Sequence, residues 1–253
     1  MTFPDLRAEQ KHQAFEQSAT ITQHKDEADF ISATTLKWGL RLFLAYFFFR
    51  LIFFALTIPA SIPPDEVTHA GICRVFSTVL LLPDNTPETY EFGLVTNIPW
   101  LYYWIMGKLL HLNFFGIPDL VFLRLLNIPL AFGTVWYALR LLRLLTDSRL
   151  VQLLLLIAMT NTPMFSLLSA SVSYDNLANL LAAMAIYYQF AFFKSPSGGL
   201  LAASLLCQMA GSLTKITFLP LILALNVLLV IYAGKDLRAF SAAIGGFGAP
   251  YLR

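Results

Sequence analysis

Three ionisable side chains stand close together in the segment SIPPDEVTHAG, residues 61–71. Asp65 and Glu66 follow two consecutive prolines, which end a preceding helix and restrict the backbone. If a short helix begins at Glu66, His69 lies on the same helical face as the carboxylates. A carboxylate and an imidazole held together can exchange protons with a substrate, as in general acid–base catalysis. The simpler alternative is that Asp65 caps the helix, and the sequence leaves both open.

Further charged side chains interrupt or border apolar runs. Asp175, in SASVSYDN, is the only acidic residue between Asp147 and Asp236, Lys215 lies in SLTKIT, and Arg50 interrupts FFFRLIFF. Ionisable groups within a membrane are rare and point to a functional site. The alternatives are a helix cap for Asp175, a snorkelling anchor for Lys215, and snorkelling or a structural ion pair for Arg50.

The composition indicates that these groups belong to a membrane protein. Of 253 residues, 57% are hydrophobic and 13% are charged, against roughly 25% charged residues in soluble domains. Apolar runs without strand-like alternation predict an all-α, polytopic transmembrane helix bundle. The net charge of +2 does not favour a nucleic-acid partner. The two cysteines, in unrelated segments, predict buried free thiols rather than a disulfide or a zinc site.

We expect two regions in the chain. Residues 1–35 are rich in Gln, Glu, Lys, His and Thr and predict a polar cytoplasmic tail. Residues 36–253 predict the transmembrane domain, and because they end within an apolar run we expect that domain to be C-terminally incomplete. The apolar segments are expected at about 38–58, 66–82, 98–112, 120–142, 150–168, 174–193, 199–214, 216–233 and from 239 onward.

The Lys and Arg residues of the short connections predict how the chain is inserted. The N-terminal tail and the later basic connections fit the cytoplasm if residues 59–119 lie outside. The aromatic segment IPWLYYW must then rest at the membrane interface. If that segment crossed instead, the Arg140–Arg149 cluster would face outward. In the favoured topology Asp65, Asp175 and Lys215 share the outer membrane face.

The order of the motifs resembles the GT-C superfamily of membrane glycosyltransferases. An apolar run is followed by PPDExxH, PWLYYW, LRLLNIPLAFGTVWYALRLLRLL, SxSYDNLA and LTKxxFLPL. Residues 36–235 look like the N-terminal half of that superfamily, which includes protein O-mannosyltransferases and oligosaccharyltransferases. They look most like a bacterial multi-span branch with a PDExxH signature. The resemblance implies a GT-C-like bundle, with interfacial helices in a long first external loop, in the bacterial inner membrane.

The resemblance also implies an activity, the transfer of a sugar from a polyprenyl-phosphate carrier to an acceptor outside the membrane. In such enzymes a carboxylate serves as general base and a cation stabilises the departing phosphate. The implied catalytic candidates are Asp65, Glu66 and Asp175. The implied substrate-binding candidates are Lys215, for the carrier phosphate, and His69 and Arg50.

A divalent cation is a further expectation from the resemblance, because some members hold a metal through carboxylates. Mg²⁺ or Mn²⁺ would fit such oxygen ligands, and Asp65 and Asp175 are the candidates if a metal is bound. The chain departs from the family before the aromatic helix. It reads Asn97-Ile98-Pro99, where the family usually has a basic residue before its prolines.

Two other classes of function compete with the enzyme. A transporter or accessory subunit for lipid-linked glycans would place polar groups near the middle of the membrane, often in broken helices. In this sequence the polar groups gather at one face, apart from Arg50, which favours the enzyme. A purely structural membrane anchor would leave Asp65 and Asp175 unexplained.

Overall fold

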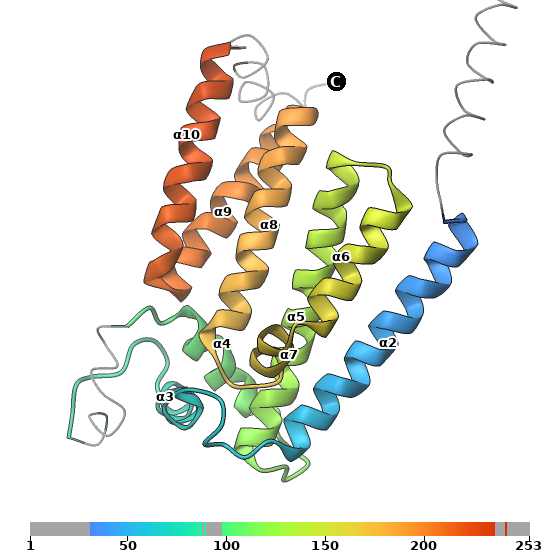
Figure 1. Ribbon diagram of the computed structural model, residues 1–253. Coiled ribbons are helices and arrows are strands. Elements are labelled where there is room, and N and C mark those ends of the chain that lie inside the picture. Colours follow the sequence, from blue (N-terminus) through green and yellow to red (C-terminus); the bar gives the residue numbers. More distant parts are fainter. Residues whose placement is uncertain (1–30, 88, 90–97, 236–240, 242–253) are drawn as a thin grey trace, which may run out of the picture.

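The computed structural model describes residues 31–87, 89, 98–235 and 241, and these residues are helical without any strand (Figure 1). The prediction of an all-α chain is therefore confirmed. The predicted run from residue 239 and most of the polar tail lie outside the described residues. The elements are α2 (Ala33–Thr57), α3 (Glu66–Thr78), α4 (Leu101–Leu110), α5 (Asp119–Leu145), α6 (Arg149–Asn161), α7 (Pro163–Ser169), α8 (Tyr174–Lys194), α9 (Gly198–Thr214), η3 (Ile216–Phe218) and α10 (Leu219–Lys235).

The described helices include four that are long and apolar enough to cross a membrane, and these are α2, α5, α8 and η3 with α10. The α6–α7 pair makes a fifth candidate, bent by 65°, and α9 is a shorter apolar helix. A helix of about 20 apolar residues matches the roughly 30 Å hydrocarbon core of a bilayer. The chain is therefore an integral membrane protein.

The run expected over residues 150–168 is not one continuous helix, because it breaks at Pro163. The residue before this proline, Thr162, adopts an extended backbone with ψ of 116°, and Pro163 becomes the first residue of α7. Proline lacks an N–H and disfavours a helical conformation in the residue before it. Apolar length alone predicted the run, and the proline determines where it bends.

Short helices and helix ends gather at one end of the bundle, named here the α3 end. Figure 1 shows α3 across this end, beside the end of α2 and the beginnings of α5, α8 and η3–α10. The opposite end holds the beginning of α2 and the end of α5. Helix α4, in the predicted aromatic segment, has only ten residues, or about 15 Å at 1.5 Å per residue. It is therefore too short to cross a bilayer.

Helices α3 and α4 are held together by a close contact and by polar caps. A Cβ atom on Gly107 of α4 would lie 2.7 Å from the carbonyl oxygen of Cys73 and 2.8 Å from the backbone nitrogen of Ser77. Glycine thus permits the two backbones to approach. The Lys108 ammonium donates to the carbonyls of Phe76 and Val79 at the end of α3. These contacts satisfy carbonyls that a helix end leaves unpaired.

Candidate functional site

Asp65 occupies the N-cap position of α3 without capping it. Its backbone is left-handed, with φ of 57°, and its side chain makes no cap hydrogen bond. The side chain is exposed and forms no hydrogen bond or ion pair with the residues that the structure describes. The capping alternative therefore does not account for this carboxylate. A left-handed conformation is uncommon outside glycine and is concentrated at functional sites.

Asp175 forms an ion pair with Lys215, across the α8–α9 contact. Asp175 lies in the first turn of α8, and Lys215 directly follows α9. The cap of α8 is Ser173, whose hydroxyl accepts a hydrogen bond from the Asp175 backbone at 3.2 Å. The two charged side chains are 30% and 27% exposed, so solvent or a ligand can still reach them. Lys215 is thus paired rather than only anchored at the membrane surface.

A cavity of about 290 Å³ adjoins this ion pair. Its size approaches the roughly 300–1,000 Å³ typical of ligand sites. Lys215 lines it, with its ammonium 5.0 Å from the centre of the Tyr174 ring. The cavity therefore combines a cation with aromatic and hydroxyl groups. Its lining residues are Ile98, Pro99, Tyr103, Tyr174, Thr214, Lys215, Ile216 and Thr217.

His69 contacts the cavity wall and feels the charges of nearby carboxylates. Its Nδ1 lies 2.8 Å from the Tyr103 hydroxyl, and its ring meets the Tyr174 ring edge-on at 4.9 Å. Burial lowers the pKa of His69, and the charges of Asp65 and Asp175 partly oppose that shift. A pKa below the ordinary value of about 6.5 favours the neutral form of the imidazole at pH 7. The structure thus brings both aspartates into the surroundings of one histidine.

Glu66, expected as a catalytic residue, is instead a buried structural group. Arg124 donates to both of its carboxylate oxygens, from Nε to Oε1 at 2.8 Å and from Nη2 to Oε2 at 2.5 Å. The backbone N–H of Val172 donates to the same Oε1 at 2.8 Å. Glu66 is 1% exposed and Arg124 is 3% exposed. A carboxylate so enclosed and occupied does not fit a role as base or as metal ligand.

Arg124 is the residue that sequence reasoning missed at this end. Besides Glu66, its Nη1 donates to the carbonyls of Ala55 at 3.2 Å and Ile58 at 2.7 Å. One guanidinium therefore joins the end of α2, the beginning of α3 and helix α5. The signal in the sequence was a lone arginine early in an apolar run. Such a charge is stable only when it is paired and hydrogen-bonded.

A second missed feature is a buried amide network beside the cavity. Asn127 accepts hydrogen bonds from the Tyr102 hydroxyl and from the Asn176 side chain, each at 3.1 Å. These three residues belong to α5, α4 and α8, so the network fixes α4 against two candidate spans. Satisfied polar networks of this kind give a core one defined arrangement. Asn127 within RLLNIPL was the available signal.

Arg50 lies against the broken span. Its Nη1 donates to the Thr160 carbonyl at 3.0 Å, and its guanidinium lies 5.3 Å from the centre of the Phe54 ring. Within the described residues it makes no hydrogen bond or ion pair with Asp175 or Lys215. The same Thr160 carbonyl accepts a hydrogen bond from the Ser166 hydroxyl at 3.2 Å, so Arg50 and Ser166 together bind a carbonyl at the break that Pro163 makes in the span. This contact favours the structural alternative for Arg50.

Metal ligands do not converge in the part of the chain that the structure describes. No group of three or more His, Cys, Asp or Glu side chains is placed there to hold a metal ion. Of the two candidate ligands, Asp175 already pairs with Lys215. Mg²⁺ and Mn²⁺ prefer several oxygen ligands, so these residues do not fit a protein-held metal. Cys73 and Cys207 are buried free thiols, as predicted.

Comparisons with protein-family models, curated proteins and solved structures returned no match for this chain. The residues Asp65, His69, Asp175 and Lys215, with the aromatic cavity that Lys215 lines, are named here the outer site, after the membrane face on which the expected topology places them.

Proposed function

We propose that this protein is a GT-C-type membrane glycosyltransferase, or part of one, that transfers a sugar from a polyprenyl-phosphate carrier to an acceptor. The observation that carries the proposal is the partly exposed Lys215–Asp175 pair at an aromatic cavity, with Asp65 and His69 nearby. The proposal places the protein in the bacterial inner membrane, with its N-terminus in the cytoplasm and residues 59–119 outside.

Lys215 is the group suited to the carrier phosphate. It follows α9 directly and lines the cavity at the α3 end, where a lipid headgroup meets the protein. Its ammonium provides three hydrogen-bond donors, and one bond goes to Asp175. A bound phosphate would share the ammonium with Asp175. Lys215 would then stabilise the negative charge that the phosphate gains as it leaves.

Asp65 is the group suited to activate the acceptor. Its carboxylate is exposed and unpaired among the described residues, whereas Asp175 is paired with Lys215 and Glu66 with Arg124. In the proposed step the acceptor hydroxyl gives its proton to Asp65, and its oxygen forms a bond to the anomeric carbon of the sugar. The bond between that carbon and the phosphate oxygen breaks, and the phosphate keeps the electron pair.

His69 and Tyr103 are suited to position the sugar. Tyr103 lines the cavity, and its hydroxyl is held by His69. A hydroxyl oriented by an imidazole offers a defined donor or acceptor to a sugar hydroxyl. We assign both residues to substrate binding rather than to proton transfer, because the structure shows them engaged with each other.

The substitution Asp65→Asn tests the catalytic assignment. It keeps the size of the side chain and removes its basicity, so transfer should fall by about 10²–10⁴-fold while the protein remains folded. The measurement is sugar transfer in proteoliposomes supplied with a panel of polyprenyl-phosphate sugars and candidate acceptors. Asp84→Asn, at an exposed carboxylate between α3 and α4 within the same proposed external segment, is the matched control. Near-normal transfer by Asp65→Asn, from a native protein that is active, would exclude Asp65 as the base.

Thiol labelling tests the proposed orientation. A cysteine replacing Asn85, which is exposed between α3 and α4, should react with a membrane-impermeant reagent in intact cells. A cysteine replacing Ser195, between α8 and α9, should react only after the membrane is opened. The reverse labelling pattern would show that the proposed orientation of the chain in the membrane is wrong. Cys73 does not serve as a probe, because it is buried.

The broken span favours a second candidate, a transporter of lipid-linked glycans. Transporters often use interrupted helices, and α6 and α7 meet at 65°. The two functions differ in their product. A transporter would move a labelled polyprenyl-phosphate sugar across a liposome membrane unchanged, whereas the glycosyltransferase would release the carrier phosphate and glycosylate an acceptor.

A further inference from the structure

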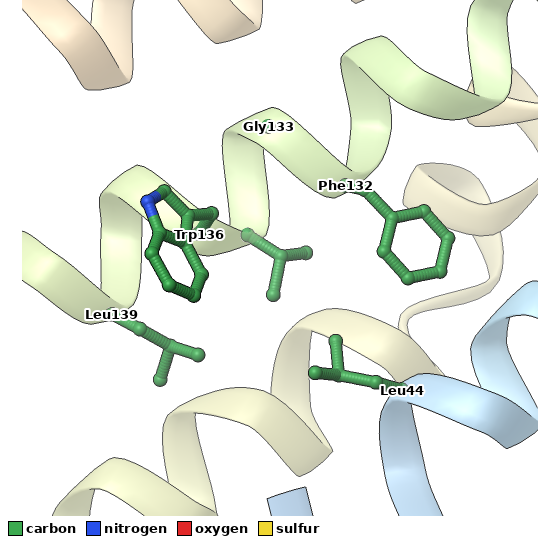
Figure 2. A pocket seen from close by; sticks show the side chains of 6 residues that line it. Leu44, Phe132, Gly133, Trp136 and Leu139 are labelled. Atoms are coloured by element: carbon green, nitrogen blue, oxygen red, sulfur yellow. The ribbon is translucent and has the colours of Figure 1, made fainter. Parts of the chain in front are cut away.

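An apolar groove lies between α2 and α5, away from the outer site. Its volume is about 410 Å³, and its lining residues are Leu44, Phe132, Gly133, Val135, Trp136 and Leu139. Figure 2 shows Leu44 on one side and Phe132, Trp136 and Leu139 of α5 on the other, around a common space. Trp136 is 56% exposed. Both helices are candidate membrane spans, so a lipid chain of the surrounding bilayer can reach this groove.

Cations lie beyond the groove at the end of the bundle opposite α3. On α5, Arg143 follows Leu139 by one turn, about 6 Å along the axis and about 40° around it. On α2, Lys37 precedes Leu44 by two turns, about 10 Å along the axis and about 20° around it. The two cations therefore continue the groove-facing stripes of their helices, and both are exposed.

The hydrogen bonds of these cations leave donors for a ligand. The Nε of Arg143 donates to Gln152 at 3.2 Å, which uses one of its five N–H groups. Arg41, also exposed, lies one turn from Leu44 and has its guanidinium 5.2 Å from the centre of the Trp38 ring. Asp147, in the connection after α5, is the acidic residue that the structure describes beside them. The described residues at this mouth of the groove therefore carry more positive than negative charge.

We propose that this groove is a binding site for an anionic phospholipid. One acyl chain lies along Leu44, Trp136 and Leu139, and Lys37 and Arg143 hold the headgroup phosphate. A cation near a membrane surface attracts anionic lipid by about fivefold in affinity, and two cations aligned with one groove select the headgroup as well as the chain. The site lies at the other end of the bundle, so it does not depend on the proposed glycosyltransfer.

The test is fluorescence quenching of Trp136 by brominated lipids. The protein is placed in nanodiscs of equal phosphatidylglycerol and phosphatidylcholine, with bromine on the acyl chains of one lipid at a time. The Trp136 signal is the difference between native protein and Trp136→Phe. Brominated phosphatidylglycerol should quench this signal more strongly than brominated phosphatidylcholine. Equal quenching by the two brominated lipids would by itself overturn the proposal.

Charge variants then locate the headgroup. Lys37→Gln and Arg143→Gln should each reduce the preference for phosphatidylglycerol by up to about fivefold. Lys235→Gln changes an exposed lysine at the end of α10 and should leave the preference unchanged. A preference that survives both test substitutions, or that falls equally in the control, would show general attraction to the membrane rather than this site.

Discussion

Two adjacent carboxylates, Asp65 and Glu66, acquire different environments from one backbone feature. Two prolines and a left-handed Asp65 begin α3 so that Glu66 enters the bundle and Asp65 stays outside. Glu66 then meets Arg124 in a bidentate pair, while Asp65 makes no side-chain contact of this kind in the described chain. Glu66 therefore orders the fold around the outer site, and Asp65 is available for chemistry.

The substitution Glu66→Gln separates these two roles. It leaves the Arg124 charge buried without its partner, so the free energy of unfolding should fall by about 3–5 kcal/mol. The measurement is thermal or denaturant unfolding in detergent. Asp119→Asn is the control, because its pair with Arg74 is 44% and 55% exposed and should contribute less than about 1 kcal/mol. If the Glu66→Gln variant were as stable as the native protein but had lost sugar transfer, Glu66 would be a catalytic residue rather than a structural one.

At the scale of elements, the α3–α4 pair forms one wall of the outer site. His69 of α3 holds Tyr103 of α4, and Lys108 of α4 binds the carbonyl groups at the end of α3. At Gly107 the backbone of α3 lies too close for a side chain on α4. The cavity therefore depends on a contact that tolerates no side chain.

The substitution Gly107→Ala should disrupt this wall. Its Cβ would collide with backbone atoms of α3, some closer than 3.0 Å, and overpacking of this kind costs about 1–3 kcal/mol. We expect a lower unfolding temperature together with weaker binding at the outer site. Gly234→Ala, with no atom within 4 Å of the new methyl group, should preserve or slightly raise stability. A Gly107→Ala variant as stable as native protein would contradict the close contact.

The sequence predicted the elements better than it predicted their contacts. Apolar length located the spans, and the order of the runs placed Asp175 and Lys215 at the same membrane face. Their ion pair required the packing of α8 against α9, which apolar composition does not encode. The Glu66–Arg124 pair was missed for a similar reason, because 58 residues separate its members. Pro163 itself was a local sign of the bend, but the prediction of one span over residues 150–168 rested on apolar length.

At the scale of the whole molecule, the Glu66–Arg124 and Asp175–Lys215 ion pairs both lie at the α3 end of the membrane bundle. The buried groups there, Glu66 with Arg124 and Asn127 with Asn176, hold helices together. The accessible Lys215 lines the cavity beside them. In the proposed function this accessible site meets lipid headgroups at one membrane face, and we propose that it recognises a lipid-borne phosphate.

The most direct test compares binding of polyprenyl phosphate and of the uncharged polyprenol to purified protein in detergent. The proposal predicts tighter binding of the phosphate form, and a loss of about tenfold or more in Lys215→Gln, since a hydrogen bond to a charged group contributes roughly 1.5–3 kcal/mol. Lys194→Gln, at the opposite end of α8, should bind like the native protein. Equal binding of the two lipids, or a Kd for polyprenyl phosphate unchanged in Lys215→Gln, would contradict the account.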